Sequence, residues 1–239
     1  MKNAPIGIFD SGIGGLTVAN AIRKVLPYEN IVYYGDTAHL PYGEKSSKSI
    51  KIFSEHITNF LINKKCKAII IACNSASSTS YKIVKKAAKD IPVFNVIDPV
   101  ISFFNNKSQS YNIGVIGTKA TIRSNIYTKK IENKNSNAKV CALETPLLAP
   151  MIEEGFINEK ISKTVIENYL SNKILNKIDH LILACTHYPL IHNEINSYYN
   201  YKVTIINSAE IVAKYISINL RNKKMLSNKR IPNYKFYVS

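Results

Sequence analysis

Short apolar runs alternate with amphipathic, helix-like segments along most of the chain. Runs of four or five mainly apolar residues predict buried parallel strands, and apolar positions that recur every three or four residues predict helices. In the first part of the chain the predicted strands are Ile6–Phe9, Ile31–Tyr34, Ala68–Ala72 and Val93–Ile97, and the helices between them are Leu16–Val25, Lys45–Lys64 and Ser75–Lys89. This alternation is typical of an α/β protein whose parallel sheet is covered by helices on both faces.

A second α/β unit follows the first. Its predicted strands are Asn112–Ile116, Lys139–Leu143, Leu181–Ala184 and Val203–Ile206, and its helices begin near Ile122 and extend over roughly Asn158–Asn172 and Ala209–Leu220. Leu147–Gly155 is predicted as a loop or short helix, and the polar tail from Arg221 carries only weak structural signals. The opening strand and polar turn of the first unit, residues 7–11, match residues 114–118 of the second. The sequence therefore predicts two similar lobes.

Two of the predicted strands end in a cysteine that is followed by hydrogen-bonding residues. One strand leads into Cys73-Asn74-Ser75, and the other leads into Cys185-Thr186-His187. Open α/β sheets bind ligands at the carboxyl ends of their strands, so each lobe would present one cysteine to a cleft. We therefore expect an α/β fold of two pseudo-symmetric lobes, each a mainly parallel sheet flanked by helices, with the active site in the cleft between them.

The composition restricts the class of protein that the chain can be. With 239 residues, of which 46% are hydrophobic and 20% charged, the chain suits one large or two small globular domains. No apolar run approaches the roughly 18–20 residues of a membrane helix, and the first residues lack the apolar core of a signal peptide, so we expect a cytoplasmic protein without a membrane association. The four cysteines form no CxxC pair, which gives little support for disulfides or for a zinc site.

The net charge of +16 is compatible with nucleic-acid binding. The lysines are scattered, however, and they accompany heavy use of isoleucine and asparagine without any nucleic-acid-binding motif. A compositional bias explains the charge better than a binding surface does, although a basic protein also attracts an anionic small substrate. A homodimer is expected only because it is the commonest homo-oligomer.

Six short motifs follow one another along nearly the whole chain. They are Gly7-Ile8-Phe9-Asp10-Ser11-Gly12-Ile13-Gly14-Gly15-Leu16, Gly35-Asp36-Thr37 with Pro41-Tyr42-Gly43, Ala72-Cys73-Asn74-Ser75-Ala76, Gly117-Thr118-Lys119-Ala120-Thr121, Pro150-Met151-Ile152-Glu153-Glu154-Gly155 and Ala184-Cys185-Thr186-His187-Tyr188-Pro189-Leu190. In this order the motifs resemble those of the glutamate racemases, in the cofactor-independent aspartate/glutamate racemase superfamily.

The resemblance implies the organisation and the activity of the chain. It implies a first lobe formed by residues 1–98 and 209–239, a second lobe formed by residues 99–208, and a pseudo-twofold relation between them. It also implies interconversion of L- and D-glutamate without a cofactor or a metal, with the D-form supplying peptidoglycan synthesis. The chain departs from the family pattern at Ser75, where threonine is expected, at Asp98, where glutamate is common, and at Asn207-Ser208-Ala209-Glu210, which replaces an Asp-Ser-Gly-type run.

Racemisation needs a base on one face of the α-carbon and an acid on the other. The resemblance implies that Cys73 deprotonates D-glutamate and that Cys185 deprotonates L-glutamate. An amino-acid α-proton is far less acidic than a thiol with a pKa of about 8.5, so the carbanionic transition state needs electrostatic stabilisation. No phosphate loop or dinucleotide fingerprint suggests a cofactor. Helix N-termini at both strand ends would bind the substrate carboxylates and lower the pKa of both thiols.

Three further residues are expected to assist the cysteines. The resemblance implies that Asp10 assists the first cysteine and His187 the second, with Glu153 as a third assistant. Glu154 is adjacent, so the register of that carboxylate stays open. From the residues alone, Asp10 also suits helix capping, and a histidine in this position also suits an ordinary buried polar group.

The implied substrate-binding set consists of the polar turns after the strands. It comprises Asp10, Ser11, Pro41, Tyr42, Gly43, Cys73, Asn74, Ser75, Thr118, Thr121, Thr186 and His187. Individually, these residues also suit turn and capping roles. The glycines at positions 12, 14 and 15 lack the GxGxxG spacing and suit a turn that allows close backbone approach. Cys66 and Cys141 are interpreted as buried, inert thiols.

Three alternatives remain at this stage. A racemase of the same superfamily that acts on aspartate is the nearest one, because the shape of the cleft sets the length of the substrate. A non-catalytic, two-lobed anion-binding protein is the second, although its two cysteines would then have no role. A redox pair is the third, but bases that oppose each other across a substrate lie too far apart for a disulfide.

Overall fold

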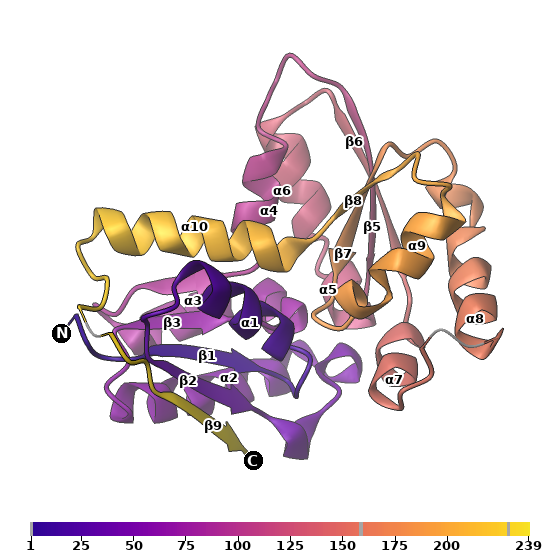
Figure 1. Ribbon diagram of the computed structural model, residues 1–239. Helices are drawn as coiled ribbons and strands as arrows, with labels where there is room; N and C mark the ends of the chain where they lie inside the picture. Colours follow the sequence, from indigo (N-terminus) through magenta and orange to yellow (C-terminus); the bar gives the residue numbers. More distant parts are fainter. Residues whose placement is uncertain (1, 158–159, 229) are drawn as a thin grey trace.

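The computed structural model describes residues 2–157, 160–228 and 230–239, which form two parallel β-sheets flanked by helices (Figure 1). The first sheet has the strand order β4-β3-β1-β2-β9. Its strands are β1 (Ile6–Asp10), β2 (Ile31–Gly35), β3 (Ala68–Ile71), β4 (Val93–Asn95) and β9 (Tyr234–Val238). The helices that pack against it are α1 (Leu16–Val25), α2 (Ser47–Asn63), α3 (Asn74–Ala88) and α10 (Ser208–Asn222).

Alternate side chains of these strands are buried on opposite faces of the first sheet. Ile8 and Ile70 pack with α1 and α10, whereas Phe9 and Ile69 pack with α2 and α3. A strand that is buried on both faces must be apolar at nearly every position, and this is why these strands appear in the sequence as continuous apolar runs.

The second sheet has the order β6-β5-β7-β8, again with every pair parallel. Its strands are β5 (Tyr111–Gly117), β6 (Ala138–Glu144), β7 (His180–Ala184) and β8 (Thr204–Ile206). The remaining α-helices are α4 (Asp98–Phe103), α5 (Lys119–Arg123), α6 (Ile126–Lys134), α7 (Leu148–Glu153), α8 (Lys160–Leu170) and α9 (His192–Tyr198), and short 3-10 turns lie at Thr37–His39, Tyr42–Glu44, Lys173–Leu175 and Tyr188–Ile191.

The internal similarity predicted from the sequence is present in the topology. Numbered within each unit, the strands of both sheets follow the order 4-3-1-2, and β9 then extends the first sheet beyond β2. The third strand of the first unit is β3, which leads into Cys73, and the third strand of the second unit is β7, which leads into Cys185. The α/β class and the two-lobe arrangement are therefore confirmed.

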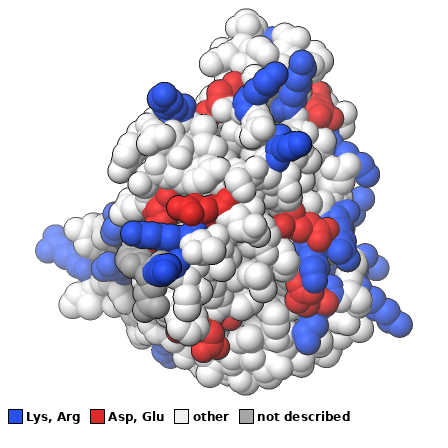
Figure 2. All heavy atoms as spheres, turned by 90° about the vertical axis from the view of Figure 1, so that its right-hand side faces the viewer, with Lys and Arg blue, Asp and Glu red and all other residues white. Residues whose placement is uncertain are grey.

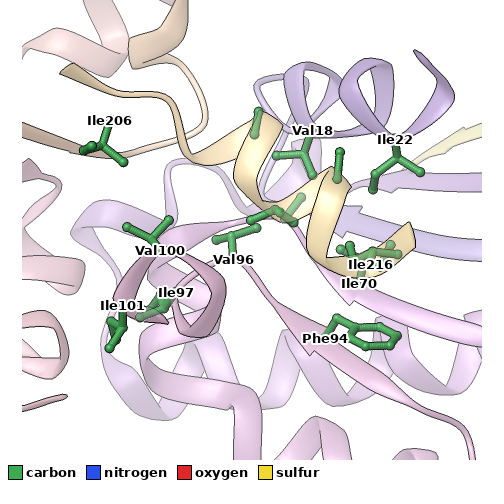
Figure 3. Packing of buried hydrophobic residues seen from close by; sticks show 14 of the residues in the cluster. Val18, Ile22, Ile70, Phe94, Val96, Ile97, Val100, Ile101, Ile206 and Ile216 are labelled. Carbon is green, nitrogen blue, oxygen red and sulfur yellow. The ribbon is translucent and has the colours of Figure 1, made fainter. Parts of the chain in front are cut away.

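One hydrophobic cluster runs through both sheets and joins them. Where the chain crosses between the lobes, it contributes Ile97 and Val100 in one direction and Ile206 in the other (Figure 3). Helix α10 returns to the first sheet, packs on α1 and places Ile216 near Ile70 of β3 (Figure 3). The shared core fixes the two sheets relative to each other.

Three details differ from the sequence-based predictions, and one expected helix lies partly outside the described residues. Helices α4 and α9 were not predicted, and the helix expected near Ile122 begins at Lys119 and is broken at Asn125, whose backbone is left-handed with φ 55°. Residues 158–159 of the helix expected over Asn158–Asn172 lie outside the described residues, and α8 is described from Lys160. The tail expected to be weakly structured contains β9, an edge strand whose aromatic and β-branched residues Phe236, Tyr237 and Val238 are a short strand signal that the prediction missed.

The surface agrees with a scattered distribution of charge. On the face shown in Figure 2, lysine and arginine side chains lie in several groups interspersed with aspartate and glutamate. Within the described part of the chain, no helix has the length and apolar character needed to span a bilayer. Cys66 is buried and Cys141 is half-buried, and all four cysteines are unpaired.

Candidate active site

A narrow cavity lies where the carboxyl ends of the strands in both sheets face each other. It is lined by Ser11, Pro41, Tyr42, Gly43, Cys73, Asn74, Ser75, Thr118, Ala149, Glu153, Ala184, Cys185, Thr186 and His187. Twelve of these residues belong to the predicted site, and the structure brings them together. Ala149 and Ala184 are small apolar wall residues with no chemical signal in the sequence. Two predicted residues, Asp10 and Thr121, lie behind the wall rather than in it.

Cys73 is the residue that caps the N-terminus of α3. Its Sγ accepts a hydrogen bond from the backbone N–H of Ala76 at 3.4 Å and donates one to Oγ of Ser11 at 3.7 Å. The thiol is buried, and burial, reinforced by the negative charge of Asp10, raises its pKa to about 12 in spite of these two hydrogen bonds. The helix N-terminus lowers this pKa through the N–H of Ala76, as expected, but desolvation of the thiolate outweighs that contribution and the net shift is upward.

Asp10 lies beneath the cavity and is completely buried. Its Oδ2 accepts the backbone N–H groups of Gly12 at 3.2 Å and Gly15 at 3.0 Å, so it holds the turn that leads into α1. Its Oδ1 accepts the hydroxyl of Thr186 from the other lobe at 3.5 Å. Burial raises the pKa of this carboxyl group, although the nearby His187 opposes the rise. A carboxyl group in this state can hold or release a proton beside the cavity.

On the second lobe, the imidazole of His187 lies between the side chains of Cys185 and Glu153. Nδ1 of His187 lies 3.6 Å from Sγ of Cys185, and Nε2 lies 2.9 Å from Oε1 of Glu153, close enough for an ion pair but outside hydrogen-bond geometry. Burial disfavours the charged imidazole, but its contacts with Cys185 and Glu153 and the charge of Asp10 raise the pKa of His187 to about 11. The neighbouring Glu154 is exposed. Glu153 is therefore the carboxylate that faces the cavity.

The two cysteines have different local structures. Cys73 begins a 15-residue helix, whereas the chain after Cys185 enters only the four-residue 3-10 turn Tyr188–Ile191. The expected helix N-terminus at Thr186 and His187 is thus replaced by a single tight turn. The group beside this second thiol is the imidazole of His187 rather than a helix N-terminus.

Hydroxyl and amide groups connect the lobes across the cavity. Oγ of Ser75 lies 2.8 Å from Oγ1 of Thr118 and 3.3 Å from Oγ1 of Thr121, so the serine that replaces the expected threonine keeps a hydroxyl contact with the second lobe. Oδ1 of Asn74 accepts the hydroxyl of Tyr127 at 2.7 Å. Its Nδ2 is buried without a hydrogen-bond partner, although it belongs to a residue of the cavity wall. A buried amide N–H₂ without a partner is suited to receiving an anionic ligand.

One side of the cavity is formed by Pro41, Tyr42 and Gly43, which we call the Pro41–Gly43 wall. The hydroxyl of Tyr42 donates a short hydrogen bond to Asp36, which is itself buried. Gly43 lies against the second lobe, since a Cβ atom there would come within 2.7 Å of Cβ of Thr118. Sequence reasoning did not select Asp36 as a site residue, although it stands in the motif Gly35-Asp36-Thr37. Among the described residues, no three His, Cys, Asp or Glu side chains are arranged to hold a metal ion.

Comparisons with known proteins agree with this geometry. The sequence profile of the Asp/Glu/Hydantoin racemase family matches residues 17–216. A glutamate racemase from Chlorobaculum tepidum is 44% identical over 212 residues, which cover 89% of this chain and 78% of that protein. The crystal structure of a Francisella tularensis glutamate racemase in complex with D-glutamate superposes with a TM-score of 0.94 at 42% identity, covering 100% of this chain and 89% of that one. A glutamate racemase from Bacillus anthracis gives a TM-score of 0.94 at 36% identity, covering 100% of this chain and 89% of that one.

Proposed function

Because the chain belongs to the Asp/Glu/hydantoin racemase family, we propose that it is a glutamate racemase whose two bases are Cys73 and Cys185. The observation that carries the proposal is the approach of two thiols to one cavity from topologically equivalent strands of the two lobes. A planar carbanion between them can lose a proton to one face and gain one on the other.

The reaction proceeds by one proton transfer at each thiol. With D-glutamate, the Cys73 thiolate removes the α-proton and the Cys185 thiol donates a proton to the opposite face, which gives L-glutamate. Cys73 is then a thiol and Cys185 a thiolate, which is the form that acts on L-glutamate. Exchange of protons with water, through Asp10 and His187, returns the enzyme to its first form.

The surroundings of the two thiols differ in charge. Beside Cys185, the high pKa of His187 keeps the imidazole positively charged at 3.6 Å from Sγ. Beside Cys73, burial and the charge of Asp10 favour the thiol. The ammonium group of a bound amino acid supplies the positive charge that the Cys73 thiolate lacks.

The substrate carboxylates require donors on the cavity wall. The N-terminus of the 15-residue α3 supplies backbone N–H groups at Asn74 and Ser75, and the unpartnered Nδ2 of Asn74 supplies a further donor. Hydroxyl groups of Ser11, Thr118 and Thr186 lie in the same wall. Stabilisation of the α-carboxylate as it gains enolate character is the electrostatic contribution that a reaction without a cofactor needs.

Three wider assignments belong to the same proposal. Residues 1–98 and 209–239 form the first lobe and residues 99–208 the second, which the packing of α10 on α1 supports. The product D-glutamate supplies peptidoglycan synthesis and hence cell-wall formation and cell shape. Four unpaired cysteines support a reducing, cytoplasmic location.

Deuterium incorporation tests the mechanism. The parent protein, Cys73→Ala and Cys185→Ala are each incubated with L- and D-glutamate in heavy water without added cofactor. Cys66→Ala and Cys141→Ala serve as matched controls, because these thiols lie outside the cavity. For the parent and the controls, the newly formed enantiomer should carry deuterium at the α-carbon while the recovered substrate stays protonated at early times. Both cavity variants should lose racemisation.

Two outcomes would contradict the proposal. Near-normal turnover by either cavity variant would exclude the two-base mechanism. Exchange with L- or D-aspartate but not with glutamate would assign the chain to the alternative substrate. The relatives carry the name glutamate racemase, and the Francisella tularensis structure contains D-glutamate, so glutamate is the expected outcome.

A further inference from the structure

The end of β9 reaches the same edge of the first sheet as the ends of β1 and β3. β9 pairs parallel with β2, with Val238 opposite Gly35, and the backbone N–H of Ser239 continues the ladder to the Gly35 carbonyl at 3.2 Å. Because all strands of this sheet are parallel, a residue at the far end of the sequence arrives beside the loop that follows β2. That loop, residues 36–43, leads directly to the Pro41–Gly43 wall of the cavity.

Side-chain contacts hold β9 in this position. The ring of Tyr237 lies 5.0 Å from that of Phe60 on α2, and Nζ of Lys64 lies 4.6 Å from the Tyr237 ring centre. On the other face of the strand, the ring of Phe236 lies 6.2 Å from that of Tyr33. The strand is therefore packed against the lobe and is not attached by backbone hydrogen bonds alone.

Ser239 makes three further hydrogen bonds to the loop. Its Oγ donates to Oδ1 of Asp36 at 2.9 Å and accepts the backbone N–H of Ala38 at 2.9 Å. Its carbonyl oxygen accepts the hydroxyl of Thr37 at 3.0 Å. One small side chain thus connects the end of β9 to both the backbone and the buried carboxylate of the loop.

Asp36 connects Ser239 to the cavity wall, because it accepts hydrogen bonds from both Ser239 and Tyr42. The carboxylate is 2% exposed, and among the described residues no lysine or arginine pairs with it. Its donors are Ser239, Nδ1 of His39 at 2.8 Å and the hydroxyl of Tyr42, whose side chain is 1% exposed and lines the cavity. A buried carboxylate depends on each of its hydrogen-bond donors. Loss of one donor therefore shifts the carboxylate and, with it, Tyr42.

We propose that Ser239 is a positioning residue for substrate binding: through Asp36 it fixes Tyr42, and Tyr42 fixes the wall formed by Pro41–Gly43. This inference rests on the proposed glutamate racemase function. The hydroxyl of Tyr42 donates to Asp36 and not to a thiol, so displacement of the wall changes the binding of substrate and transition state alike. Such a change raises KM and leaves kcat nearly unaltered.

Three variants of the full chain test the proposal. Ser239→Ala removes the hydroxyl and leaves the strand pairing intact, Ser239→Thr restores a hydroxyl, and Lys235→Ala changes an exposed residue of the same strand. Steady-state kinetics are measured in both directions, together with the melting temperature with and without D-glutamate. Ser239→Ala should raise KM for both enantiomers about three- to tenfold with kcat within about twofold of the parent, as expected for one lost hydrogen bond. It should also weaken the stabilisation by D-glutamate.

The rescue and control variants separate the outcomes. Ser239→Thr should regain most of the affinity, and Lys235→Ala should match the parent. If Ser239→Ala has the same KM as Lys235→Ala, or if it loses kcat and melting temperature without a change in KM, the positioning role is wrong while the racemase function stands. If the parent itself neither racemises nor binds glutamate, the proposed function fails, and this inference fails with it.

Discussion

Gly14 of the first lobe lies directly against the imidazole of His187 of the second lobe. A Cβ atom at Gly14 would come within 2.4 Å of Cε1 and 2.7 Å of both ring nitrogens of His187. The absence of a side chain at this glycine is therefore what allows His187 to cross from one lobe to the other. Its imidazole can then stand between Cys185 and Glu153.

Substitution of Gly14 should therefore impair catalysis by displacing His187. We expect Gly14→Ala to lower kcat/KM by roughly 100-fold or more, since a positioned proton-transfer group contributes about 10²- to 10⁴-fold. L- and D-glutamate have equal free energies, so kcat/KM must fall equally in the two directions. Circular-dichroism assays from each enantiomer measure this.

A control substitution distinguishes this effect from simple overpacking. A Cβ atom at Gly114 would contact Ile178, Leu181 and Leu175 at 2.9–3.1 Å in the core of the second lobe. Gly114→Ala should lower the melting temperature but leave the kinetic constants of the folded protein unchanged. Equal activities of Gly14→Ala and the parent would show that the position of His187 does not matter.

The reactivity of Cys73 should increase with pH into an unusually alkaline range. Burial and the charge of Asp10 raise the pKa of this thiol to about 12, so its alkylation rate should still rise about tenfold per pH unit between pH 8 and 10. A free cysteine peptide levels off above its pKa of about 8.5. Peptide-level mass spectrometry after iodoacetamide treatment measures the rate, and a plateau below pH 9 would contradict this assignment.

The raised pKa of Cys73 also makes the free energy of unfolding decrease as the pH rises. The folded state binds the Cys73 proton more tightly than the unfolded state does, so unfolding releases a proton at a pH between the two pKa values. The contribution of this thiol to the free energy of unfolding is fully present below the unfolded-state pKa and is lost as the pH rises toward about 12. Cys73→Ala should show a weaker alkaline loss of stability than the parent in urea titrations.

Removal of the Glu153 charge should lower the pKa of His187. Burial lowers this pKa, whereas contacts with Cys185 and Glu153 raise it to about 11. In Glu153→Gln the imidazole should lose its proton at a lower pH, and because this imidazole is the proton-exchanging group beside Cys185, activity should decline at a correspondingly lower pH. Nitrogen NMR of the labelled histidine, compared with the pH profile of kcat, provides the measurement. The matched control is Glu154→Gln, which changes an exposed carboxylate; an equal shift in both variants would contradict a specific role for Glu153.

Removal of one partner of a buried ion pair should strongly destabilise the first lobe. Nζ of Lys67 lies 2.5 Å from Oε2 of Glu29, both side chains are at most 3% exposed, and Nζ also donates to the carbonyl of Met225 at 2.7 Å. Lys67→Met leaves a buried carboxylate unpaired, so the free energy of unfolding should fall by about 3–5 kcal/mol. Lys119→Met breaks a partly exposed pair with Glu44 and should cost about 1 kcal/mol or less. Similar losses in the two variants, measured by urea unfolding, would contradict the distinction.

Most of the fold could be predicted because its strands are buried on both faces. β1, β3 and β7 appear in the sequence as continuous apolar runs, and both cysteines follow such runs. β9 has strand-forming residues but follows a polar segment at the sheet edge, so its short run alone does not reveal which strand it joins. Its existence depends on pairing with β2, a contact between residues far apart in the chain.

The candidate site was predictable in its members but not in its arrangement. The ordered motifs identified Cys73, Cys185 and most of the wall, because a polar turn after a buried strand is a local feature. The motifs did not reveal that Asp10 lies behind the cavity or that Asp36 supports Tyr42. The raised pKa of Cys73 was likewise not evident, because desolvation depends on the atoms that surround the thiol in the folded protein.

The sequence by itself determined the α/β alternation, the duplication and the two strand-end thiols, because each depends on the order and polarity of neighbouring residues. Only the tertiary structure decided how the thiols differ: Cys73 begins a helix above buried Asp10, and Cys185 stands beside His187. It also decided that β9 pairs with β2 at the edge of the first sheet and brings Ser239 to Asp36. These relations are contacts between distant segments, and their strength depends on burial, which exists only once the chain has folded.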